Sequence, residues 1–100
     1  MKVKYSREFE KSVRKLSGKT LNSVRDTILD VKNASCLDDI SNCKRLVDFD
    51  NVYRIRIGGL RAFFVFHVEI IDDYVFFKYL VPRGEAYDKK NMESLRAADK

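Results

Sequence analysis

The sequence has few of the residues that build metal and disulfide sites. Its 100 residues include two cysteines and one histidine. Cys36 and Cys43 lie seven positions apart, with no histidine or third cysteine near them. This pattern indicates neither a zinc site nor a disulfide framework, so we expect two reduced thiols and neither a metal nor another cofactor.

Long apolar runs are missing as well. No run reaches the roughly 18 residues that a membrane-spanning helix needs, and Met1-Lys2-Val3-Lys4 lacks the apolar core of a signal peptide. With one proline, 45% apolar and 35% charged residues, the composition is typical of a folded domain rather than a disordered tail. We expect one cytoplasmic domain over residues 1–100 that does not contact a membrane.

Positive charge, by contrast, is in excess. The chain has 20 lysines and arginines against 15 aspartates and glutamates, which gives a net charge of +5. This excess favours an anionic partner such as nucleic acid or an acidic protein. The place of the arginines in the fold therefore bears directly on function.

The first third of the chain has the apolar period of amphipathic helices. Ser6 is a candidate N-cap, and the stripe that follows predicts a helix over 6–17, ended by Gly18. A second stripe begins at Leu21 and fades at Asn33, so the two helices form a hairpin. Residues 34–43 are polar and aperiodic, which predicts a connecting loop.

From Lys44 onward the apolar period changes from 3.6 to 2, which is typical of strands. Turn residues divide this part into four strands, expected at 44–49, 52–57, 60–70 and 74–81. Pro82 ends the last strand because it cannot donate a ladder hydrogen bond, and Asp88 caps a short closing helix. We expect an α+β fold: an N-terminal strand, a helical hairpin packed on one face, a four-stranded antiparallel meander and a short C-terminal helix.

A two-residue turn at Gly58-Gly59 fixes the register of the central hairpin. Counting outward from it places Arg56 directly opposite Arg61, with Arg54 on the same face, while the apolar residues share the face under the helices. If Asp50-Asn51 also forms a two-residue turn, Arg45 joins the same row beside Arg56. Like charges that face each other are destabilising unless an anion lies between them.

Two interpretations of this face stay open. It is either the solvated side of a half-covered sheet or an RNA or phosphate site on an open sheet face, because arginine presents a planar fork to phosphate oxygens and nearby aromatic rings can stack on bases. His67, the only histidine, lies about 20 Å along its strand from the arginine row. We therefore interpret it as a partly buried residue under the closing helix and not as a catalytic base.

The same residues resemble a known family. The runs Lys44–Val47, Tyr53–Arg61 and Val81–Tyr87 are similar to the RelE/ParE superfamily of bacterial toxins, and the order of elements agrees over nearly the whole chain. The resemblance implies a toxin of a type II toxin-antitoxin pair, held inactive by its antitoxin. The RelE branch cleaves messenger RNA in the ribosomal A site, whereas the ParE branch poisons DNA gyrase and lacks the nuclease residues.

The resemblance also implies roles for particular residues. It makes Arg61, Arg83 and Tyr87 catalytic, and it places Arg54 and Arg56 where RelE has lysines. We expect these two arginines to bind RNA, together with Arg45 of the same row. In cleavage without a metal, the 2′-hydroxyl attacks the adjacent phosphate, so a proton must leave it and charge must be stabilised. Arginine suits the second task but is a poor base, which leaves Tyr87 for proton transfer.

Three functions remain open at this point. The first is a RelE-like, ribosome-dependent endoribonuclease, which Arg83 and Tyr87 favour. The second is a ParE-like protein that binds gyrase and has no nuclease chemistry. The third is an inactive relic that binds its antitoxin and only represses transcription, because the expected site holds no histidine or lysine base.

Overall fold

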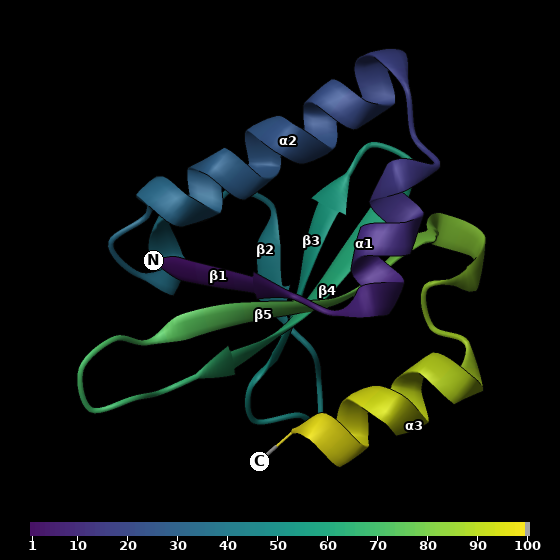
Figure 1. Cartoon of the computed structure of the whole chain (residues 1–100). Coiled ribbons are helices and arrows are strands. Elements are labelled where there is room, and N and C mark those ends of the chain that lie inside the picture. The colour runs from purple at the N-terminus through teal and green to yellow at the C-terminus, as the bar shows by residue number, and fades with distance from the viewer. Residues whose placement is uncertain (100) are drawn as a thin grey trace.

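The computed structural model describes residues 1–99, which form a five-stranded sheet with helices on both faces (Figure 1). The strands are β1 (Lys2–Tyr5), β2 (Cys43–Arg45), β3 (Val52–Ile57), β4 (Leu60–His67) and β5 (Tyr74–Pro82). The helices are α1 (Arg7–Arg14), α2 (Gly18–Asn33) and α3 (Lys89–Ala98), with 3-10 turns η1 (Leu37–Asp39) and η2 (Arg83–Glu85). The order β1-β5-β4-β3-β2, with β1 parallel to β5 and the other pairs antiparallel, confirms the expected α+β fold.

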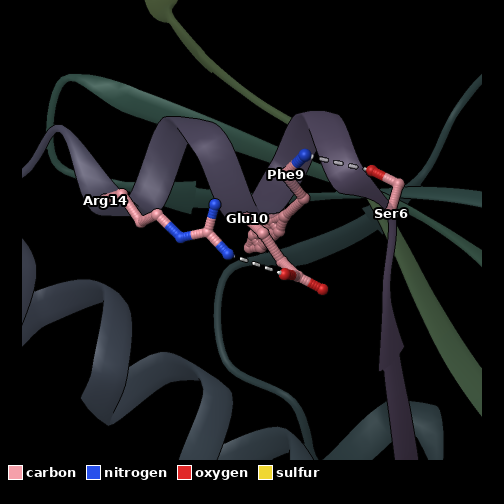
Figure 2. A network of polar contacts seen from close by, with 4 residues as sticks. All are labelled: Ser6, Phe9, Glu10 and Arg14. Carbon is pink, nitrogen blue, oxygen red and sulfur yellow. Dashed lines mark hydrogen bonds and ion pairs between the residues drawn. The ribbon is translucent and has the colours of Figure 1, made fainter.

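Ser6 begins α1 and also ties it to the sheet. Its Oγ accepts a hydrogen bond from the Phe9 backbone N–H at 3.0 Å, drawn in Figure 2, and donates one to the Lys78 carbonyl at 2.6 Å. The predicted N-cap is confirmed. The cap sets the Phe9 ring against the sheet, with its centroid 4.9 Å from that of Phe77.

The boundary between the two helices differs from the prediction. α1 ends at Arg14, with Lys15 as its C-cap, before the predicted end at residue 17. Gly18 does not end α1, because it is the first residue of α2 and takes a φ of +58° there. Ser17 is already the N-cap of α2, so the linker is too short for a separate stop. The predicted end of the second helix at Asn33 is confirmed.

α1 and α2 cover one face of the sheet. Their fully buried side chains are Phe9, Val24 and Val31. The strands contribute the buried residues Ile55, Ile57, Ala62, Phe64, Val75, Phe77 and Leu80 to the same cluster. The predicted apolar face under the helical hairpin is therefore confirmed, and hydrophobic burial there is a main source of stability.

α3 lies on the opposite face of the sheet (Figure 1). The prediction that this face is open is therefore wrong in part, because Leu95 of α3 is fully buried in a second apolar cluster that includes Phe63 of β4. The predicted cap of the closing helix is confirmed: the Asp88 carboxylate accepts a hydrogen bond from the Lys90 backbone N–H at 2.7 Å.

The end of α3 is fastened to the loop between β2 and β3. The Asp99 carboxylate accepts hydrogen bonds from the backbone N–H groups of Asp50 and Asn51, at 2.8 and 2.7 Å. The Arg96 guanidinium lies 4.4 Å from the centroid of the Phe49 ring, a cation–π contact. These contacts hold the C-terminal end of α3 against the β2–β3 loop.

Two predicted strands are shorter than expected. The strand expected at 44–49 is only Cys43–Arg45, because the residues after it form a loop in which Asp48 takes a φ of +68°. The strand expected at 60–70 ends at His67. The predicted loop before β2 contains the 3-10 turn η1. Within residues 1–99, no helix is long and apolar enough to cross a membrane.

Candidate functional site

The hairpin of β3 and β4 has the register that the glycine pair predicted. Gly58 takes a φ of +56°, in a region that residues with a side chain rarely adopt. Arg56 lies directly opposite Arg61, and Arg54 lies opposite Phe63. The predicted juxtaposition of two like charges is therefore confirmed.

Arg61 is the buried cation of this face, with 8% of its surface exposed. Its Nη1 donates hydrogen bonds to the carbonyls of Gly58 and Leu60, both at 2.9 Å. These bonds fix the guanidinium against the glycine turn. Burial lowers the pKa of Arg61, because a charged group is less well solvated there.

Charged neighbours also act on Arg61. Burial is the largest cause of the lowered pKa of Arg61. The cations Arg56, Arg83 and Arg54 lower this pKa further, whereas Tyr87 raises it. The five side chains are thus close enough to interact electrostatically. We call the four cations the arginine cluster: Arg54, Arg56, Arg61 and Arg83.

Arg83 reaches the cluster from the segment after β5. That strand ends at Pro82, which lies opposite Leu60 beside the glycine turn. The Arg83 backbone N–H donates a hydrogen bond to the Gly59 carbonyl at 2.9 Å, which ties η2 to the turn. The Arg83 residue is exposed, so its guanidinium is accessible to a ligand.

Tyr87 lies at the edge of the cluster. Its ring packs edge-on against Phe63, with 5.9 Å between centroids, and its hydroxyl accepts a long hydrogen bond from Arg54 Nη1 at 3.5 Å. Tyr87 is 56% exposed. It therefore presents a phenol both to solvent and to the cations beside it.

The predicted position of Arg45 is wrong. Arg45 pairs with Tyr53 and not with Arg56, because a long loop and not a two-residue turn joins β2 to β3. Lys44 instead lies opposite Arg54. Lys44 was not among the predicted site residues; the spread of turn-forming residues after it is the signal of a longer loop that could have found it.

The arginine cluster has no internal counter-charge. Within residues 1–99, the only ion pair joins Arg14 to Glu10 on α1, at 3.3 Å (Figure 2). The buried Nε of Arg54 has no hydrogen-bond partner. Because guanidinium groups bind phosphate oxygens through paired N–H donors, the cluster is suited to a phosphate-bearing ligand.

Other reactive side chains are poor candidates for the chemistry. His67 ends β4 and stacks on Tyr74, with 4.6 Å between ring centroids. Burial raises the pKa of the Cys43 thiol to about 11, against a smaller lowering by the Arg54 charge, so this thiol is protonated at neutral pH. No three His, Cys, Asp or Glu side chains of the described chain, residues 1–99, are grouped as metal ligands.

A cavity of about 290 Å³ adjoins the cluster, between the β2–β3 loop and α3. Its apolar lining is Leu46, Val47, Phe49 and Met92. Its polar lining is Lys44, Arg45, Arg54 and Tyr87. A larger cavity of about 720 Å³, near Met1 and Cys36, is lined by no member of the arginine cluster.

Comparison with known proteins gives a consistent set of relatives. No protein-family model matches the chain. The chain is 27% identical over 89 residues to Toxin RelE3 of Methanocaldococcus jannaschii, which covers 88% of this chain and 97% of that toxin. Its fold is similar to a chain of the RelB-RelE antitoxin-toxin complex from Methanococcus jannaschii, with a TM-score of 0.67, 21% identity and coverage of 85% and 95%. The isolated E. coli RelE toxin matches with a TM-score of 0.64, 14% identity and 97% of both chains.

These relatives include an archaeal protein, so the superfamily is wider than the bacterial toxins that the motifs resemble. At such low identity the solved structures show the common fold alone, and the sequence match adds a similarity to one RelE toxin. The motifs, the fold and this match agree over most of the chain. The chain is thus similar in sequence to a RelE toxin and shares the fold of RelE chains of solved structures.

Proposed function

We propose that this chain is the toxin of a type II toxin-antitoxin pair and a metal-independent endoribonuclease that cleaves messenger RNA on the ribosome. Its relatives are a RelE toxin and a RelE chain bound to a RelB antitoxin. The proposed partners are an antitoxin, the ribosome and messenger RNA. These meet in the cytoplasm, where cleavage stops translation.

The observation that carries this proposal is the convergence of two chain segments on one site. The β3–β4 hairpin supplies three arginines, and the segment after β5 brings Arg83 and Tyr87 to them. A purely solvated sheet face has no reason to collect four cations without a carboxylate. A phosphate diester between them would offset the repulsion and use their hydrogen-bond donors.

The proposed chemical step uses these side chains and the RNA, and the ribosome positions the RNA for it. The 2′-oxygen of one nucleotide attacks the adjacent phosphorus as its proton is removed, and the bond from phosphorus to the 5′-oxygen of the next nucleotide breaks. That oxygen takes up a proton, leaving a 2′,3′-cyclic phosphate and a 5′-hydroxyl. Negative charge on the phosphate oxygens rises in the transition state, which cations stabilise.

The geometry supports different tasks for the catalytic residues. Arg83 is exposed and is free to bind a phosphate oxygen. Arg61 is held by the turn carbonyls and adds a fixed charge beneath the site. Tyr87 is the proton-transfer group, since arginine does not give up its proton readily. The ribosome supplies the attack geometry, which the flexible RNA lacks on its own.

Arg54 and Arg56 bind the RNA backbone on either side of this centre. Both belong to β3 and lie on the face of Arg61. Arg45 does not lie beside Arg56. Its Nη1 donates a hydrogen bond to the Phe49 carbonyl at 2.8 Å. We therefore assign Arg45 to the adjoining cavity and give its place in the row to Lys44.

The alternative is a ParE-like toxin that binds gyrase without nuclease chemistry. The test is induction of the chain in cells, followed by primer extension on messenger RNA. We expect cuts within codons, and no such cuts when Arg83→Ala is expressed at the same level. Intact messages together with gyrase-linked DNA breaks would instead support the ParE-like function.

Two substitutions at Tyr87 separate proton transfer from base stacking. Tyr87→Phe keeps the ring and removes only the hydroxyl, so we expect a large loss of single-turnover cleavage on ribosomes with RNA binding retained. Tyr87→Ala should lose both. If Tyr87→Phe cleaves at the wild-type rate, Tyr87 is a stacking surface and the base lies in ribosomal RNA or solvent.

A further inference from the structure

The cavity beside the arginine cluster shares two side chains with it. Arg54 belongs to the cluster and lines the cavity, and Tyr87, whose hydroxyl contacts Arg54, lines it too. The nucleotide whose phosphate binds the cluster therefore has this cavity within its reach. The cavity opens to solvent past Val47, which is 80% exposed.

The lining has two chemically distinct sides. The apolar side comes from the β2–β3 loop and from Met92 of α3, and it suits the faces of a planar ring. The charged side consists of Lys44, Arg45 and Arg54, which are hydrogen-bond donors without an acceptor among them. No carboxylate belongs to the described lining. An inorganic anion would satisfy the donors but not the apolar side.

Arg54 also has unused hydrogen-bonding capacity. Its Nη1 makes only the long contact with Tyr87, and its buried Nε has no partner. A buried donor without a partner carries a free-energy cost. A ligand that brings an acceptor against Arg54 would recover part of that cost after a small shift of the guanidinium.

We infer that this cavity is a base-binding subsite that prefers the keto bases guanine and uracil over the amino bases adenine and cytosine. Guanine presents the O6 and N7 acceptors and uracil its O4 acceptor, which match a wall of donors. The amino groups of adenine and cytosine would point a donor at three cations. The inference rests on the proposed function, and it names the bases of the RNA that the site recognises.

The test is a nuclear magnetic resonance titration of the whole chain with GMP, AMP and inorganic phosphate. Because GMP and AMP carry the same phosphate, the ratio of their affinities reports on the base alone. We expect GMP to bind about fivefold more tightly than AMP or better, with shifts at the methyl groups of Leu46, Val47 and Met92. Phosphate should perturb the arginine cluster and leave those methyl groups unmoved.

Two exposed valines give a matched pair of variants. Val47→Glu places an acceptor and a negative charge at the cavity mouth, so we expect the GMP-to-AMP affinity ratio to fall to about one. Val68→Glu makes the same change at a residue that is 74% exposed and lies outside the cavity lining, and should keep the wild-type ratio. Equal affinities in the wild type, or a ratio that Val47→Glu leaves unchanged, would overturn the inference. Ribosomes take no part, so a failure here is distinct from a failure of the nuclease proposal.

Discussion

The two faces of the sheet are built on different principles, although the same strands form both. On the face under α1 and α2, side chains such as Ile55 and Ile57 are buried in an apolar cluster. On the other face, their neighbours Arg54 and Arg56 join a cluster of cations next to a smaller apolar core under α3. Alternation along β3 thus places its apolar side chains in the core under the helices and its arginines in the cationic cluster.

The cationic face carries features that weaken a fold. Arg56 and Arg61 are like charges in directly opposed positions, and Arg61 is buried as well. The Nε of Arg54 is buried without a partner. Each feature disfavours the folded state in the absence of a ligand. Stability therefore comes mainly from the helical-hairpin face, whereas the cationic face carries unfavourable contacts that the proposed ligand would relieve.

The largest expected effect tests the stabilising face. Phe9→Ala removes a fully buried ring that packs on Phe77 and leaves a cavity under α1. We expect a loss of about 3–5 kcal/mol in the free energy of unfolding, measured by urea denaturation. A loss below about 1 kcal/mol would show that this face does not dominate stability.

A smaller effect is expected on the other face, at the attachment of α3. Asp99→Ala removes the acceptor of two backbone N–H bonds, from Asp50 and Asn51. We expect a loss of about 1–3 kcal/mol, seen in hydrogen exchange as faster exchange in α3 and the β2–β3 loop. Amides of α1 should exchange as in the wild type. Uniform acceleration over the chain would mean that the two faces unfold as one unit.

The smallest effect has the opposite sign. Arg56→Ala relieves the repulsion with Arg61, and Arg56 is exposed, so little packing is lost. We expect the free energy of unfolding to rise by up to about 1 kcal/mol at low salt, and the gain to shrink as salt screens the charges. Destabilisation that is independent of salt would contradict a repulsion between Arg56 and Arg61.

Local sequence patterns predicted the register of the central hairpin but not the connection between β2 and β3. Two adjacent glycines admit a tight turn, so the pairing of Arg56 with Arg61 followed from counting. Arg45 was misplaced because a six-residue loop and a two-residue turn have similar composition. Only the packing of Phe49 under Arg96 of α3, far along the chain, distinguishes them.

Local sequence patterns also could not predict that Arg83 and Tyr87 lie beside the β3–β4 hairpin. The pairing of β4 with β5 shifts by one residue at an irregularity between Phe63 and Phe64. The shift changes the spacing of the residues of β5 that face the helices, but the strand is too uniformly apolar for this change to be read from the sequence. The exit from β5 depends on the bond from Arg83 to Gly59, a contact between distant parts of the sequence. The resemblance to RelE named these two residues, and the fold explains how they reach the cluster.

The most direct test of the central claim measures activity and stability in the same variant. The exposed Arg83 is the best choice, because Arg61 also bonds the turn carbonyls and its removal would disturb the hairpin. In Arg83→Ala, we predict a loss of about 3 kcal/mol in transition-state stabilisation, roughly a hundredfold in single-turnover cleavage of messenger RNA on ribosomes. The free energy of unfolding should stay within about 0.5 kcal/mol of the wild type. Cleavage at the wild-type rate by a folded Arg83→Ala protein would contradict the claim that the arginine cluster is the catalytic site.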